Sequence, residues 1–100
     1  MIVFRHGAND FKNLRMECSG TAASETNAAA SALMKAAIEA LRRRNPPRLD
    51  IQADVDRITV KCEYNQHTAE IAMVVICGFE WLAKQLPDEV KVERIHSKKV

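Results

Sequence analysis

Apolar and polar residues alternate along the N-terminal part of the chain, which is the period of half-buried β-strands. Residues 2–6 form the first such segment, and Leu14, Met16 and Cys18 mark the second. Between them, glycine and asparagine supply residues that tolerate a positive φ, in the stretch Gly7-Ala8-Asn9-Asp10. The pattern predicts an antiparallel hairpin closed by that turn.

From Glu25 the apolar residues take the spacing of a helix. Alanine, the best helix former, dominates the first turns, and an apolar stripe follows at Leu33, Met34, Ala37, Ile38 and Leu41. Ser24 is the expected N-cap, because its hydroxyl can accept a hydrogen bond from the first turn. Pro46-Pro47 cannot continue a helix, so we expect an amphipathic helix over residues 25–44.

A second hairpin is predicted further along the chain. Apolar residues alternate with polar ones in two segments, at Leu49, Ile51, Ala53 and Val55 and then at Ile58, Val60, Cys62 and Tyr64. The turn between the segments is expected at Asp54, Asp56 and Arg57.

The remainder of the chain predicts a second helix and a last strand. The helix is expected from about Gln66 to Leu86, and the strand around Val90 and Val92. The predicted order is ββαββαβ over residues 1–100. This order indicates a single α+β domain in which a mostly antiparallel sheet packs with two helices.

Composition places the chain among ordinary globular proteins. Its 100 residues are 47% apolar and 28% charged, with a formal net charge of +2, which is unlike a disordered chain. Three cysteines without CxxC spacing argue against a disulfide framework and for a reducing compartment. No signal peptide is expected, and the longest apolar run, residues 71–79, is too short to span a membrane. We therefore expect a cytoplasmic protein.

Small residues cluster where the first hairpin joins the first helix. The chain reads Ser19-Gly20-Thr21-Ala22 there and, at the helix start, Asn27-Ala28-Ala29-Ala30-Ser31-Ala32-Leu33. These residues resemble the active-site segment of the ribosomal-processing cysteine protease (Prp) family. In that family a Gly-His-Ala turn ends the second strand and a Cys-Ala-Ala-Val-Ser-Ala-Leu run opens the first long helix. Residues 70–87 also resemble the family's second helix, so the likeness covers nearly the whole chain.

The resemblance implies a protease scaffold without protease chemistry. Thr21 stands where the family has its histidine, and Asn27 where it has its cysteine. A cysteine protease needs a thiolate and a base within hydrogen-bond reach, and neither side chain supplies these near neutral pH. We therefore assign no catalytic residue. A groove formed by Gly20, Thr21, Ala22 and Asn27 is instead expected to accept an extended peptide by edge pairing, as a non-catalytic binding module.

An alternative hypothesis is a cysteine hydrolase that uses Cys18. This residue lies near the expected helix N-terminus, but it shares the face of Leu14 and Met16, which indicates a core thiol. His6 is its only early partner. We expect the two to be separated by about six or seven residue levels, roughly 20 Å, because His6 would lie beside the tight turn and Cys18 at the open end.

The other thiols fit core positions. Cys62 alternates with Ile58 and Val60, and His67 is expected in the exposed first turn of the second helix. Cys77, inside the apolar helix, is expected in the core or in an interface. No close ligand pairs predict a metal site, and no glycine-rich phosphate loop predicts a nucleotide cofactor.

An arginine cluster supports a third hypothesis, a ribosome- or RNA-associated accessory protein. Its members are Arg42, Arg43, Arg44 and Arg48, which could contact phosphates. The same arginines also suit the C-terminal dipole of the first helix. No neighbouring aromatic residue offers base stacking.

The second helix is apolar nearly all round, so it must be covered on more than one side. We expect one stripe to face the sheet, formed by Ile71, Val74, Val75, Gly78 and Leu82. Other apolar residues then need cover, namely Met73, Ile76, Cys77, Phe79, Trp81 and Ala83. We expect a homodimer formed through this helix to supply it, and the family resemblance also implies a dimer.

Overall fold

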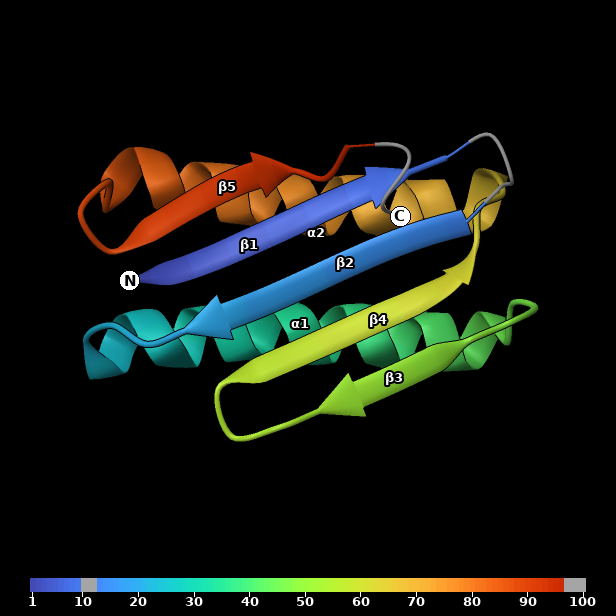
Figure 1. Ribbon diagram of the computed structural model, residues 1–100, viewed down its shortest axis with the longest axis horizontal. Coiled ribbons are helices and arrows are strands. Elements are labelled where there is room, and N and C mark those ends of the chain that lie inside the picture. Colours follow the sequence, from blue (N-terminus) through green and yellow to red (C-terminus); the bar gives the residue numbers. More distant parts are fainter. Residues whose placement is uncertain (10–12, 97–100) are drawn as a thin grey trace.

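The computed structural model describes residues 1–9 and 13–96, and its elements follow the predicted order ββαββαβ (Figure 1). Their bounds are β1 (Ile2–Ala8), β2 (Asn13–Gly20), α1 (Ser24–Arg44), β3 (Asp50–Ala53), β4 (Arg57–Glu63), α2 (Gln66–Gln85) and β5 (Val90–Arg94). The strands form a single five-stranded sheet in the order β3-β4-β2-β1-β5. The predicted α+β class is confirmed.

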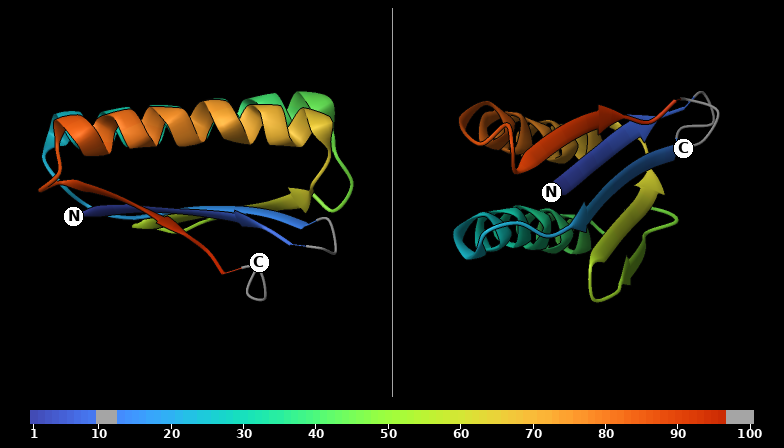
Figure 2. Two further views of the ribbon diagram at one scale, coloured as in Figure 1. Left: turned by 90° about the horizontal axis from the view of Figure 1, so that it is seen from above. Right: turned by 60° about the vertical axis from the view of Figure 1, so that its left-hand side comes forward.

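Three of the strand pairs are antiparallel and one is parallel. β2 pairs antiparallel with β1 and with β4, and β3 pairs antiparallel with β4. The chain crosses through α2 before β5 joins β1 in parallel, because parallel neighbours need a long connection. Both helices lie on one face of the sheet (Figure 2). This arrangement leaves two layers, with the core between them.

Two stacked rings form the centre of the core. The rings of Phe4 on β1 and Phe79 on α2 have centroids 4.1 Å apart and an interplanar angle of 5°, and both side chains are 0% exposed. Val75 and Leu82 lie one turn to either side of Phe79 and are also buried. These contacts attach α2 to the sheet.

A glycine lies where the two helices meet. A Cβ atom at Gly78 would lie 2.7 Å from Cδ2 of Leu33, well inside ordinary van der Waals contact. The missing side chain therefore lets α2 approach α1 closely at this level.

The rotation of α2 differs from the sequence-based expectation. Val74 was expected to face the sheet, but it is 71% exposed, whereas Phe79, which was expected to need cover elsewhere, is fully buried. The buried residues of the helix are Thr68, Ala72, Val75, Phe79 and Leu82. The expectation was wrong because a helix that is apolar all round gives no polar face from which to read its rotation.

The hairpin turns also differ from expectation. Gly7 and Ala8 continue β1 instead of forming the turn, while Asp10 lies outside the described residues. Val55 does not extend β3; it lies in the next turn and is fully exposed, between Asp54 and Asp56. Val55 continued the apolar alternation in the sequence, which made the predicted strand run two residues past the end of β3.

The ring stack generates a stability prediction. Replacing Phe79 with alanine, Phe79→Ala, should lower the free energy of unfolding by about 3–5 kcal/mol, because it removes a fully buried ring and leaves a cavity beside Phe4. Urea unfolding followed by circular dichroism measures the change. The matched control is Val55→Ala, which truncates a fully exposed side chain and should leave stability unchanged within about 0.5 kcal/mol. Equal losses for the two variants would contradict this account of the core.

Candidate functional site

The connection from β2 to α1 begins with a glycine in a left-handed conformation. Gly20 has φ of +90°, which L-residues with a side chain rarely adopt. A Cβ atom there would also collide with the carbonyl oxygen of Met1. The amide of Gly20 donates a hydrogen bond of 3.0 Å to the carbonyl of Asp56, which ties the end of β2 to the turn between β3 and β4.

The side chain of Asn27 closes the same connection. Its Oδ1 accepts a hydrogen bond of 2.8 Å from the amide of Ala22, and its Nδ2 donates one of 3.0 Å to the carbonyl of Ala22. One side-chain amide therefore satisfies both backbone groups of the residue that leads into the helix. Asn27 holds the start of α1 against the end of β2.

This arrangement corrects the expected N-cap. The cap residue of α1 is Ala23, and Ser24 is the first helical residue. The alanine side chain makes no cap hydrogen bond, and the amide of Ala23 donates instead to Oε1 of Glu89 at 3.0 Å. Serine was a reasonable expectation from the sequence, but the Asn27 amide has already fixed the entry into the helix from inside its first turn.

An open hollow of about 270 Å³ lies beside this connection. Thr21 and Asn27 both line it, so the two positions that resemble a protease site meet at one depression. The other walls come from α1, from Cys18 on β2, and from the turn between β3 and β4 with Asp54 and Asp56. The sequence did not indicate that turn as part of the site, because it is distant along the chain and only strand pairing brings it near.

Edge pairing of a peptide with β2 is excluded by the sheet order. β2 lies between β1 and β4, and its backbone is paired on both sides along nearly its whole length. The strand edge near the hollow belongs to β3, which is paired on one side only, with β4.

Cys18 lies in the wall of the hollow, but as a protonated thiol. Burial raises its pKa from 9.0 to about 11, because a charged thiolate is poorly solvated there. The expected distance to His6 was wrong: β1 and β2 pair Phe4 with Cys18 and His6 with Met16, so the two levels differ by only two residues, about 7 Å along the strand. The sequence estimate placed the hairpin register incorrectly.

Proximity along the strands does not make Cys18 and His6 a pair. The ring of His6 stacks on Phe4, with centroids 5.8 Å apart, and the pKa of His6 is lowered, mainly by burial and then by the charge of Arg94. Within residues 1–9 and 13–96, no hydrogen bond joins a cysteine to a histidine. The Phe4 ring, directly opposite Cys18, stacks on the imidazole instead.

The remaining thiols occupy different environments. Cys62 is a buried core residue, and burial raises its pKa from 9.0 to about 11. His67 is exposed in the first turn of α2, where the sequence placed it. Cys77 is exposed on α2, so the expectation of a core position is wrong for the single chain, and its place in an interface stays a prediction.

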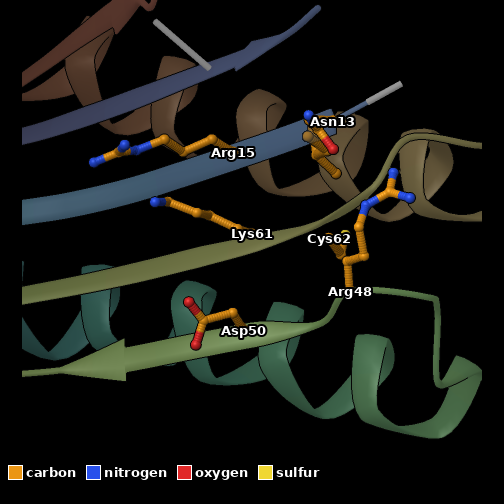
Figure 3. A pocket seen from close by; sticks show the side chains of 7 residues that line it. Asn13, Arg15, Arg48, Asp50, Lys61 and Cys62 are labelled. Atoms are coloured by element: carbon orange, nitrogen blue, oxygen red, sulfur yellow. The ribbon is translucent and has the colours of Figure 1, made fainter. Parts of the chain in front are cut away.

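The structure divides the arginine cluster into two parts. Arg42, Arg43 and Arg44 are exposed on the last turn of α1, where Arg43 bonds to Glu39 at 3.2 Å. Arg48 instead lines a second hollow of about 350 Å³ (Figure 3), together with Lys61 and Asp50. That hollow lies near the start of β2, whereas Thr21 follows the end of the strand, so Arg15 in the hollow and Thr21 are about 20 Å apart along the strand.

Further cations accompany Arg48 from positions that the sequence did not single out. Arg15 and Lys61 face each other across β2 and β4 and line the hollow of Figure 3. Arg15 lies 3.7 Å from the buried carboxylate of Glu17, which Arg57 also contacts at 3.1 Å. Asp50 stands opposite Lys61 in the ladder. Carboxylates on the same sheet face thus offset much of the positive charge.

Among residues 1–9 and 13–96, no group of three or more His, Cys, Asp or Glu side chains could hold a metal ion. No helix in these ranges is both long and apolar enough to cross a membrane.

Comparison with solved structures shows the fold class. The crystal structure of an essential ribosomal processing protease, Prp, from S. aureus with a covalently linked product peptide has a TM-score of 0.83 at 17% identity, covering 95% of this chain and 100% of that one. The same protease with a substrate peptide gives 0.77 at 14% identity, with the same coverage. A protein from Streptococcus mutans gives 0.73 at 18% identity, covering 95% of this chain and 94% of that one.

The chain therefore has the fold of the ribosomal processing proteases. No family model matches the sequence, and no curated protein matches it. At 14–18% identity these comparisons show the scaffold alone.

The role of Asn27 leads to a second prediction. Asn27→Ala should lower the free energy of unfolding by about 1–2 kcal/mol, because both backbone groups of Ala22 lose their partner. Asn27→Asp keeps an acceptor for the Ala22 amide and loses the donor to the Ala22 carbonyl. Its free energy of unfolding should therefore fall between those of the wild type and of Asn27→Ala. Thermal and urea unfolding measure the losses. Ser24→Ala, one turn away, removes a hydroxyl that caps nothing, and a loss as large as that of Asn27→Ala would refute the assigned role.

The raised thiol pKa values lead to a third prediction. At pH 7.5 the thiolate fractions of Cys18 and Cys62 should be about 100-fold lower in the folded than in the unfolded protein, so iodoacetamide should modify them about 100-fold more slowly. Because the unfolded chain releases these protons from pH 9 upward, stability should also fall between about pH 9 and 11. Peptide mapping by mass spectrometry measures the rates. Fast labelling of Cys18 in the folded protein would contradict the raised pKa and would favour the hypothesis that Cys18 is a catalytic nucleophile.

Proposed function

We propose that this protein is a non-catalytic, protease-like binding module that accepts an extended peptide and acts as a homodimer. The observation that carries the proposal is the hydrogen-bonded state of Asn27. The residue at the helix start, where the resemblance puts a nucleophile, has no ionisable group and has both of its amide atoms engaged by Ala22. Thr21, at the position of the base, cannot take a proton near neutral pH.

The alternative hydrolase would need Cys18 to act as the nucleophile. Its burial and its pKa of about 11 keep it protonated at neutral pH, and the thiolate is the reactive form. His6, the nearest candidate base along the strands, stacks on Phe4. These features weigh against a Cys18 mechanism and in favour of binding without turnover.

The binding surface proposed for the peptide is the hollow at Thr21 and Asn27 together with the edge of β3. The hollow of about 270 Å³ reaches the turn that follows β3, and β3 offers backbone groups that β4 does not use. A peptide could therefore add a strand beside β3 and place a side chain in the hollow. The complexes of the S. aureus protease with product and substrate peptides support a peptide as the class of ligand.

A homodimer through α2 is proposed from the residues that the single chain leaves uncovered. Met73, Val74 and Trp81 are 59%, 71% and 61% exposed, and Cys77 lies between them. Large apolar side chains gathered on one helix mark an interface more often than a free surface. The unpaired thiols are consistent with the cytoplasmic location expected from the sequence.

The arginine residues give the ribosome- or RNA-associated hypothesis little support. Arg42, Arg43 and Arg44 do not line the hollow that contains Arg48, and Glu39 already pairs with Arg43. Acidic side chains stand beside Lys61 and Arg15 on the sheet. A nucleic-acid surface would present an unopposed positive field.

The function can be tested with a phage-displayed library of extended peptides. The wild-type protein should enrich a peptide family, and Ser31→Phe, which fills the hollow, should weaken the binding of those peptides at least about tenfold. The matched control is Ser24→Phe, at an exposed position outside the hollow, which should bind as the wild type does.

The same peptides test for catalysis. Incubation of the selected peptides with the protein, followed by mass spectrometry, should show no cleavage. Cleavage that disappears in Cys18→Ala would replace this proposal with the hydrolase. Absence of any peptide enrichment would contradict the binding module.

A further inference from the structure

The outward face of α2 can be located from its buried face. Successive residues of a helix are about 100° apart, and the five buried residues of α2 centre on the direction opposite Cys77. Cys77 therefore lies in the middle of the solvent-facing stripe, in agreement with its exposure. Both helices lie on the same face of the sheet, and within residues 1–9 and 13–96 no segment covers their outer side (Figure 2).

The stripe is complementary to itself about Cys77. Met73 and Trp81 lie four residues before and after it, and both are more than half exposed, at 59% and 61%. Glu70 and Lys84 lie seven residues before and after it, and both are exposed. An antiparallel copy of the helix centred on Cys77 would bring Met73 level with the apolar Trp81 of the partner, and Glu70 level with a lysine of opposite charge.

We propose that two copies of this protein pack their α2 helices antiparallel, with the two-fold axis passing beside Cys77. This arrangement rests on the homodimer of the proposed function and specifies its interface. Trp81 comes level with the partner's Met73 and Val74, so its indole is covered by apolar side chains. Sulfur–aromatic contact stabilises such a pair, and an isologous interface makes each contact twice.

Charge complementarity selects this register over others. Glu70 comes level with the partner's Lys84 at both ends of the stripe, about 10 Å from the axis. Within one chain the two residues are fourteen positions apart, about 21 Å along the helix, so they cannot neutralise each other there. A parallel pairing would instead set Glu70 beside the partner's Glu70, a like-charge contact that disfavours association.

The neighbouring helix extends the surface. Ala28, Ala32 and Ala36 of α1 are exposed at one-turn spacing, and α1 and α2 lie side by side in one layer (Figure 2). These small side chains let the partner's larger ones lie close to α1. An ordinary interface buries roughly 800 Å² of surface on each partner. The two helices together offer more surface for this than α2 does alone. Glu80, about 60° from the centre of the stripe, falls at its rim, where its carboxylate stays in water.

The register is tested by charge reversal. Size-exclusion chromatography with light scattering over a concentration series should give a wild-type dimer of twice 11.2 kDa. Glu70→Lys and Lys84→Glu should each weaken dimerisation at least about tenfold, because each puts like charges opposite one another. The double variant E70K/K84E should restore the wild-type constant to within about threefold. An equimolar mixture of the two single variants should form a heterodimer, since opposite charges then face at both ends.

Two controls keep the outcomes distinct. Lys61→Glu, on the sheet face away from the helices, should leave dimerisation unchanged. A short bismaleimide should cross-link Cys77 to the partner's Cys77 in the wild-type protein, and Cys77→Ser should abolish the cross-link while the dimer remains.

Each result decides a separate question. A monomer at micromolar concentrations overturns both this register and the proposed homodimer. A dimer that neither cross-links at Cys77 nor responds to the charge reversals overturns the register and leaves the homodimer standing. Peptide binding at the hollow is measured independently of both.

Discussion

The stacking of Phe79 on Phe4 fixes the rotation of α2 about its own axis, and the outer surface of the molecule depends on that rotation. With the two rings 4.1 Å apart and fully buried, the helix cannot turn without opening a cavity in the core. Gly78, the preceding residue, then lies toward α1, where an added Cβ atom would lie 2.7 Å from Leu33. Cys77, two residues before Phe79, is directed into solvent. One aromatic contact therefore decides which apolar residues build the core and which remain available to another molecule.

The second structural constraint is the connection from β2 to α1. Gly20 turns the chain with a positive φ, and the Asn27 amide holds both backbone groups of Ala22. The start of a helix is a position at which backbone dipoles favour an anion, such as a thiolate. In this chain a neutral side chain occupies that position and contributes hydrogen bonds to the scaffold. Residues at reactive sites commonly lower the stability of the fold. The two hydrogen bonds of the Asn27 amide are expected to raise it.

The sequence predicted the elements well because each has a strong local signal. Alanine content and the Pro46-Pro47 stop defined the first helix, which begins one residue before the expected position. The register of the first hairpin was less accessible. β1 runs on through Gly7 and Ala8, because turn-forming residues permit a turn without requiring one. The distance between His6 and Cys18 depended on that register and was overestimated accordingly.

The candidate site was predictable only in part. The positions of Thr21 and Asn27 were visible as departures from a motif, yet the bonds of Asn27 to Ala22 and the contribution of the β3–β4 turn were not. The cations Arg15 and Lys61 became neighbours of Arg48 through the pairing of β2 with β4 and the position of the segment before β3.

The sequence by itself determined the order of strands and helices, the residue types at Thr21 and Asn27, neither of which is a thiol or an imidazole, and the excess of apolar residues in the second helix. These follow from residue identity and local periodicity. Tertiary structure alone decided the strand register, the environment of Cys18 and the direction in which α2 presents Met73, Cys77 and Trp81. The physical reason is that a helix with apolar residues on every side has no preferred face of its own. Its rotation is set by contacts with residues far away in the chain, here by the ring of Phe4.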